Sequence, residues 1–482
     1  MDGLGTRLKG LEEDHTNAFK AAGTTAYSLD EQYSIVDTSK LLELVKLVGA
    51  GCRCGSKLFV TTSSMTGHAL KLAFQCGECA TTTEWIGSKE YSDGSLEVNR
   101  DMVVAWEITG GERGHYFKFA ETMRCGTYNA TSYDQTVGLM RPVILEMEDK
   151  VLKNNIDAVN QDNNQTILGF DCQHSRSQRS FGAAPYATTT FISHTPGPNY
   201  GKILYQSHIS SHQMKEQNMT GKESKDKHTV VKGLTKMVEL IDNIKHGICD
   251  GSSSGNKSWN DVVQKSAKYE TKLPPLSNCF WHGSKGIPAK FNKQVLERRF
   301  RAKTKKGLRK KRGNLRFPEL IEIGLTGKKV KAHFIRAQKM FPGNAGEMSE
   351  EFQGLAEFYQ ELSENSLPKE TVKAVEKFLE TNSKKMEKYA LGYKTDLEES
   401  FHRVVLKYWK KGTSYSYEQY VTKRALAFLD WSENFHAAKK TSYFRKDIVD
   451  TFKKFLSTRS RAKTAQNNHY TPTKHGITQY YQ

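Results

Sequence analysis

The spacing of hydrophobic and polar positions changes several times along this chain. Short apolar runs of strand length occur at 57–62, 69–74, 166–173, 184–193, 202–210 and 244–249. Apolar residues at three- and four-residue spacing, which predict helices, occur over much of 97–160, 230–241, 318–395 and 396–435. This alternation of strand-rich and helix-rich segments predicts an α+β protein. Its 482 residues are too many for one core and predict several domains.

Two close pairs of cysteines flank the first two predicted strands. Cys52 and Cys54 precede this hairpin, and Cys76 and Cys79 follow it. A hairpin that brings two such turns together can hold Zn²⁺ in a tetrahedron of thiolates, as in a zinc ribbon. The first pair is C-x-C where C-x-x-C is usual, which predicts a strained first turn. Four unliganded thiols at strand ends are the alternative.

The order of elements after residue 165 predicts the architecture of the second half. Three strands are followed by a helix, a fourth strand, a helix near 259–266, and a fifth strand that ends at Cys279–His282. This is the succession of the ribonuclease H-like α/β fold, in which the first and fourth strands are neighbours. Asp171 lies near the end of the first strand and Asp250 directly after the fourth, so we expect them to meet.

A third acidic residue is expected from the helix that begins near residue 396. Glu398 and Glu399 are the two candidates: on a helical wheel Glu398 lies nearer the flank of the apolar stripe, and Glu399 lies roughly opposite it. Three carboxylates can hold two Mg²⁺ or Mn²⁺ ions for phosphodiester chemistry. Taken singly, such residues are more often turn formers or charges that compensate a helix dipole.

The charge of the chain indicates an anionic partner. Its 72 Lys and Arg exceed its 53 Asp and Glu, for a net charge of +19, which favours nucleic acid. The densest basic run supplies the candidate DNA-binding residues Arg298, Arg299, Arg301, Lys305, Lys306, Arg309, Lys310, Lys311 and Arg312. Such a run also serves as a nuclear localisation signal or is simply a solvated surface. No apolar run is long enough to predict a membrane span.

Eight cysteines and a polar beginning without an evident secretory signal favour a reducing compartment. We expect the following segments: an N-terminal arm (1–48), a zinc-ribbon-like domain (49–96), a helical region that is a candidate for DNA contact (97–160), the first part of the core (161–297), a basic and helical insertion (298–395), core completion with C-terminal helices (396–458) and a disordered tail (459–482).

From about residue 50 to 440 the chain resembles eukaryotic DDE-type DNA transposases of the Kolobok and Mutator-like kind. The resemblance is carried by the cysteine ribbon followed by Glu97-Val98-Asn99-Arg100, by the strand ends at Asp171 and Asp250, by Cys279-Phe280-Trp281-His282 and by Glu399-Ser400-Phe401-His402. It implies that Asp171, Asp250 and Glu399 are the catalytic triad. It also implies that His282 lies beside the triad, where it would help to hold the transposon end.

The function implied by this resemblance is that of a nuclear transposase. It would use Mg²⁺ or Mn²⁺ to cleave double-stranded DNA at transposon ends and transfer the 3′ ends to target DNA, as a homo-oligomer with zinc in its ribbon. The alternative is a domesticated transposase-derived DNA-binding or regulatory protein without cleavage activity. A structure-selective nuclease is a third interpretation, which fits the metal chemistry but not the Cys-x-x-His box.

Overall fold

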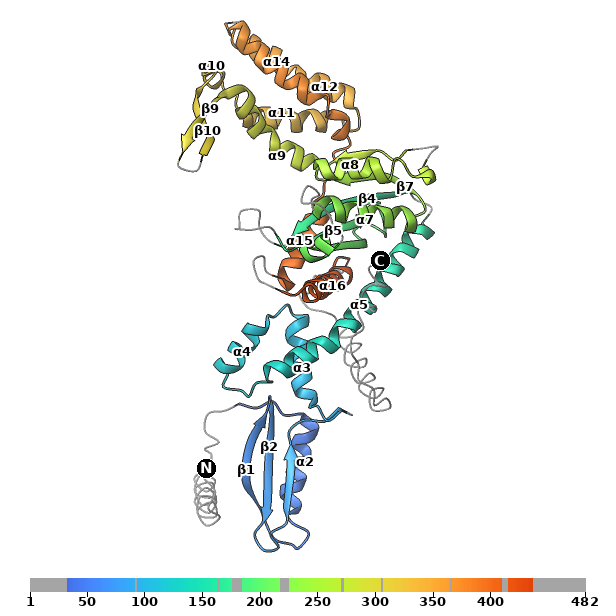
Figure 1. The fold of residues 1–482 in the computed structure, drawn as a ribbon, viewed down its shortest axis with the longest axis vertical. Helices are drawn as coiled ribbons and strands as arrows, with labels where there is room; N and C mark the ends of the chain where they lie inside the picture. Colours follow the sequence, from blue (N-terminus) through green and yellow to red (C-terminus); the bar gives the residue numbers. More distant parts are fainter. Residues whose placement is uncertain are drawn as a thin grey trace. The chain divides into compact units, whose positions relative to one another are not determined.

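The computed structural model describes residues 33–91, 93–162, 165–175, 184–216, 225–269, 273–304, 307–364, 366–409 and 415–436. Figure 1 shows the ribbon. The described chain forms two compact units, residues 33–147 and 148–436. Helices and sheets are both present, so the protein is α+β as predicted. Across these ranges, no helix combines the length and the apolar character that a membrane crossing needs.

The first unit contains a three-stranded antiparallel sheet. Its strands, in spatial order, are β1 (Leu58–Thr66), β2 (Ala69–Cys76) and β3 (Thr82–Ile86). The preceding helix α2 (Thr38–Ala50) begins where Asp37 accepts a hydrogen bond from the Ser39 backbone. Leu44 and Leu47 of α2 pack against the sheet core around Trp85. The expected boundary at residue 48 therefore falls inside a helix that belongs to the sheet.

Three helices follow, as the periodicity predicted. They are α3 (Glu97–Ile108), α4 (Arg113–Thr122) and α5 (Ala130–Gln161). Val103, Tyr116 and Tyr133 form their common core. Asn99, part of the Glu97–Arg100 motif, is buried and accepts a hydrogen bond of 2.7 Å from the His68 backbone. Asn99 therefore fastens α3 to the β1–β2 turn, which is a structural role.

The second unit is built on a five-stranded sheet. In spatial order the strands are β6 (Ile203–Ser210), β5 (Tyr186–Ser193), β4 (Thr166–His174), β7 (Ile244–Cys249) and β8 (Leu276–Asn278). The strand β5 is antiparallel to both of its neighbours, β6 and β4, whereas β7 is parallel to β4 and β8 is parallel to β7. The prediction that the first and fourth strands of this region are neighbours is confirmed.

Helices cover both faces of this sheet (Figure 1). The helices α7 (Lys225–Leu240) and α8 (Ser253–Val262) pack on one face, where Phe170, Leu234 and Trp259 share a core. The helices α15 (Asp396–Tyr408) and α16 (Tyr417–Asn434) pack on the opposite face. A short helix, α6 (Ser211–Glu216), follows β6. Because side chains alternate along a strand, consecutive residues of β4 face different helix layers.

The segment between β8 and α15 forms a helical subdomain with its own core. Its elements are α9 (Phe280–Phe291), the π-helical turn η2 (Asn292–Leu296), β9 (Glu297–Thr304), β10 (Gly307–Leu315), α10 (Glu319–Glu322), α11 (Gly327–Met340), α12 (Ala345–Gln353), α13 (Leu355–Leu362), α14 (Lys369–Ser383) and η3 (Met386–Lys388). Phe291, Phe334 and Phe352 lie at the centre of this core. The predicted helices over 318–395 are confirmed.

Two details of the second unit differ from the sequence prediction. The Cys279–His282 box does not end a strand: β8 stops at Asn278, and Cys279 is the N-cap of α9. The helix after β7 begins earlier than predicted, because the Ser252 hydroxyl accepts a hydrogen bond from the Gly255 backbone and caps α8. The short 3₁₀ helix η1 (Ala267–Tyr269) follows it.

The basic run also differs from prediction at the level of the backbone. Residues 298–316 belong largely to the antiparallel hairpin β9–β10, which was not expected because charged residues at most positions hide the strand alternation. The side chains of residues 298–314 lie outside the described part of the structure, as do Lys305 and Lys306 entirely. The last part of the predicted C-terminal helices, residues 437–458, and the tail from 459 also lie outside it.

Candidate functional site

Asp171 and Asp250 lie at the same level of two adjacent parallel strands, Asp171 inside β4 where its pairing with β7 ends, and Asp250 directly after β7. The register pairs Phe170 of β4 with Cys249 of β7, and the two aspartates are the next residues. Asp250 begins a tight turn in which its Oδ1 accepts a hydrogen bond of 2.8 Å from the Ser252 backbone. Gly251 provides the positive φ of 83° that the turn requires. The sheet topology thus brings together two acids that are distant in sequence.

Glu398 enters this site from α15 and is fully buried. Both of its carboxylate oxygens lie close to His194 Nε2, at 2.9 and 3.2 Å. The pair fits only because residue 169 of β4 is a glycine: a Cβ there would lie 2.1 Å from Glu398 Oε1 and 2.4 Å from His194 Nε2. His194 was not predicted from the sequence. A glycine inside a strand signals a close approach by another group, and Gly169 was the available signal.

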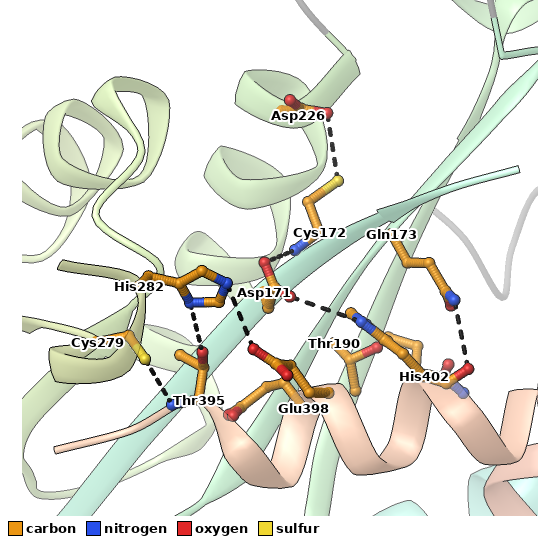
Figure 2. A network of polar contacts seen from close by, with 12 residues as sticks. Asp171, Cys172, Gln173, Thr190, Asp226, Cys279, His282, Thr395, Glu398 and His402 are labelled. Carbon is orange, nitrogen blue, oxygen red and sulfur yellow. Dashed lines mark hydrogen bonds and ion pairs between the residues drawn. The ribbon is translucent and has the colours of Figure 1, made fainter. Parts of the chain in front are cut away.

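Glu399 lies next to His282 on the more accessible side of α15. Its Oε1 is 3.3 Å from His282 Nε2, and the two side chains are 37% and 34% exposed. His402, one turn further along α15, has its Nδ1 3.6 Å from Asp171 Oδ2. Figure 2 shows Asp171 between His282 and His402, above the helix that carries Glu398. The Glu-Ser-Phe-His segment therefore supplies two groups that line the site.

The Cys-x-x-His box is held against the start of α15. The Thr395 backbone donates a hydrogen bond of 3.3 Å to Cys279 Sγ, and the Thr395 hydroxyl lies 3.4 Å from His282 Nδ1. Hydrogen bonding to Cys279 and the charges of Glu399 and Asp171 raise the pKa of His282 to about 9. His282 is therefore protonated at neutral pH and adds a positive charge beside the acids.

Negative charge is concentrated around Asp171. Loss of hydration, followed by the charges of Asp250 and Glu398, raises the pKa of Asp171 well above its usual value. Its Oδ1 accepts a 2.8 Å hydrogen bond from the Cys172 backbone, which opposes this rise. Carboxylates in this arrangement repel one another, and a bound cation would relieve that repulsion.

The acidic residues are more widely spread than the ligands of a single ion. Among described residues, Asp171, Asp250 and Glu399 are not a set whose ligand atoms all lie within 4.8 Å of one another. Two ions about 3.5–4 Å apart share their ligands over a larger volume than one ion does. The two candidates for the third acid differ in their surroundings. The charge of Glu398 raises the pKa of Asp171, whereas Glu399 is accessible and contacts His282.

The four N-terminal cysteines form a cluster that could hold a metal ion. Their sulfur atoms all lie within 4.8 Å of one another. Cys52 Sγ is 3.4 Å from Cys79 Sγ, and Cys54 Sγ is 3.4 Å from Cys76 Sγ. A tetrahedral zinc ion with bonds of about 2.3 Å places its sulfur ligands about 3.8 Å apart, which is close to this spacing.

Both turns of this cluster are tight backbone structures. Gly55 follows Cys54 with a φ of 89°, and its N–H donates a 2.8 Å hydrogen bond to the Cys52 carbonyl. The shortened C-x-C pair is accommodated by this glycine, since only a residue without a Cβ adopts positive φ freely. In the second turn, the Cys76 backbone donates a 3.0 Å hydrogen bond to the Thr81 carbonyl.

Comparison with protein-family models and with curated proteins gives no match for this chain.

Proposed function

We propose that the protein is a divalent-metal-dependent DNA transposase with a ribonuclease H-like core. It would cleave DNA at transposon ends and transfer the 3′ ends to target DNA, as a homo-oligomer in the nucleus. The observation that carries the proposal is that Asp171 and Asp250 directly follow the last paired residues of the adjacent parallel strands β4 and β7, near Glu398 of α15. Parallel strands that end in acids are suited to hold hard cations at the edge of a sheet.

We assign Glu399 as the third metal ligand and Glu398 to a supporting role. A catalytic ion needs open positions for water and substrate, so its protein ligands must reach a solvent-accessible edge. Glu399 is 37% exposed. Glu398 has no exposed surface and both of its oxygens already face His194. Glu398 would add negative charge behind Asp171 and hold α15 against β4.

The carboxylates would hold Mg²⁺ or Mn²⁺, which supply an activated oxygen nucleophile and stabilise the leaving oxygen. Asp171 is the central residue, because the negative charges of Asp250 and Glu398 both raise its pKa. His282, protonated and beside Glu399, is placed to neutralise a DNA phosphate and so to position the strand. His402, whose Nδ1 lies 3.6 Å from Asp171 Oδ2, would orient the Asp171 carboxylate.

Zinc is the metal that we propose for the cysteine cluster, because four thiolates in a tetrahedron are a typical structural zinc site. The cluster would hold the two turns of the ribbon together. The zinc-ribbon unit and the β9–β10 hairpin are the proposed DNA-binding surfaces. The reason is the excess of basic residues in the chain, which attracts DNA phosphates.

The test is a strand nicking and joining assay with the full-length protein. Supercoiled plasmid and a labelled 3′-hydroxyl oligonucleotide are incubated with Mg²⁺ or Mn²⁺, and the products are separated on agarose. We expect nicked plasmid and labelled, joined plasmid from the parent. Asp171→Asn and Asp250→Asn should lower both products at least about 100-fold, since each removes a ligand of the reacting ions.

Asp261→Asn is the matched control, because Asp261 is 40% exposed and pairs with Lys265 at 3.2 Å, away from the acidic site. It should leave both products unchanged. Nicking without joining would favour a nuclease, and DNA binding without either product would favour the domesticated alternative. If Asp171→Asn and Asp250→Asn nick DNA as the parent does, the proposed chemistry is wrong.

A further inference from the structure

A second group of metal-ligand side chains lies on the opposite face of β4 from the acidic site. Cys172 and His174, two residues apart on the strand, both point towards the beginning of α7, where they meet Asp226. His174 Nε2 lies 2.6 Å from Asp226 Oδ1, and the Cys172 thiol donates a hydrogen bond of 3.3 Å to the same oxygen. Figure 2 shows Cys172 directed away from its neighbour Asp171 and towards Asp226.

These three side chains have the chemistry and the spacing of a metal site. Their ligand atoms lie within 4.8 Å of one another, and all three residues are half-buried. Thiolate, imidazole and carboxylate together are the donor types that bind Zn²⁺ and similar borderline ions, with bonds of about 2.0–2.3 Å. In a tetrahedron the nitrogen and oxygen ligands would lie about 3.3 Å apart, so the His174–Asp226 contact of 2.6 Å would open by about 0.7 Å.

The shared oxygen of Asp226 explains how the site would form. Without an ion, two hydrogens, one from His174 and one from the Cys172 thiol, converge on Asp226 Oδ1. On binding, a divalent ion would displace the thiol proton and coordinate the neutral imidazole through Nε2, with the ring proton on Nδ1, and the thiolate and the Asp226 carboxylate would then balance its two positive charges. Three protein ligands leave a fourth position for water.

We propose that Cys172, His174 and Asp226 form a second zinc-type site, in addition to the cysteine cluster and apart from the acidic site. The bound ion would fasten the carboxyl end of β4 to the first turn of α7. The same strand end carries Asp171, whose carboxylate accepts the Cys172 backbone N–H at 2.8 Å. The ion would therefore hold Asp171 in place from behind, as a positioning element and not as part of the reacting site.

The experiment is elemental analysis of the full-length protein after zinc loading and dialysis against metal-free buffer. We expect two zinc ions per chain in the parent and one in Cys172→Ser, His174→Ala and Asp226→Asn. In a Cys52→Ser, Cys54→Ser variant, which lacks the ribbon site, one ion should remain. Adding His174→Ala to that variant should remove it. Cobalt substitution of the ribbon-deficient variant should give the visible absorption of a site with a single thiolate.

Two matched controls separate ligand removal from general damage. Cys125→Ser changes a half-buried cysteine outside both clusters, and His212→Ala breaks an exposed pair in which His212 Nδ1 lies 3.3 Å from Glu216. Both variants should keep two ions. Asp250→Asn should also keep two, which makes this test independent of the proposed function. A parent with one zinc ion per chain, or a second ion that all three substitutions leave in place, would overturn the proposal.

Discussion

The side chains of neighbouring residues in β4 lie on opposite faces of the sheet. Asp171 and Gln173 face α15 and α16, where Gln173 accepts a 2.6 Å hydrogen bond from the buried Arg424. Cys172 and His174 face α7. The strand therefore brings an acidic site and a Cys-His-Asp cluster within one residue of each other while the sheet separates them.

The two glutamates of α15 should differ in what their removal affects. Glu398→Ala leaves His194 buried without its partner, which should lower the free energy of unfolding of the second unit by about 3–5 kcal/mol. Glu399→Ala should change it by less than about 0.5 kcal/mol and should abolish strand cleavage. Urea denaturation followed by the nicking assay measures both effects. Glu380→Ala, at an exposed pair with Lys384, is the control that should change neither.

The stability that His282 provides should depend on pH. Its pKa is raised to about 9 by hydrogen bonding to Cys279 and by the nearby acids, so its contribution is complete below about pH 6.5 and disappears as the pH rises through about 9. His282→Gln should therefore be less stable than the parent at pH 6 by about 1 kcal/mol or less, because the group is one-third exposed. Denaturation at pH 6, 8 and 10 tests this. A difference that grows with pH would contradict the assignment.

At the scale of elements, helix caps and tight turns decide where the site residues lie. Ser252 is the N-cap of α8, and Asp250 lies two residues before it, at the start of the turn that leads into the helix. Cys279 is the N-cap of α9, which places His282 in the first turn of the helix and within reach of Glu399. In the ribbon, Gly55 closes the shortened cysteine turn. These local conformations set side-chain positions that the hydrophobic pattern does not specify.

The ribbon should depend on its metal more than the core does. Cys76→Ser removes one thiolate, so the variant should bind one zinc ion fewer and become sensitive to protease within residues 50–90, whereas residues 148–436 should remain resistant. Limited proteolysis with mass spectrometry, alongside elemental analysis, measures this. Cys249→Ala is a suitable control, because this buried cysteine lies in β7 outside the ribbon. If the ribbon resists protease without bound zinc, its hydrophobic core alone is sufficient to keep it folded.

For the whole molecule, the proposed binding to DNA would depend mainly on charge. A net charge of +19 predicts binding that weakens steeply with salt. Changing Arg309, Lys310, Lys311 and Arg312 to Gln should weaken binding to any duplex. It should also reduce the slope of log K against log salt by roughly 0.9 for each DNA phosphate that is no longer neutralised. Fluorescence anisotropy over a range of salt concentrations measures the slope. An unchanged slope would assign the basic hairpin to another role.

The sequence by itself determined most strands and helices of the second unit and the proximity of Asp171 to Asp250. The strand pattern and the intervening helices predicted that β4 and β7 are neighbours, and the register confirms this. The cysteine spacing predicted a cluster, and the four sulfurs do converge. These predictions succeeded because apolar periodicity and short-range spacing act locally along the chain.

Only the tertiary structure decided which side chains meet across those elements. His194 and Glu398 lie far apart in sequence and meet because Gly169 leaves room between them. Cys172, His174 and Asp226 converge because α7 begins beside the end of β4. The hairpin β9–β10 was hidden because charged side chains do not follow the alternation of a half-buried strand. Contacts of this kind depend on packing between distant segments, and no local pattern in the chain encodes them.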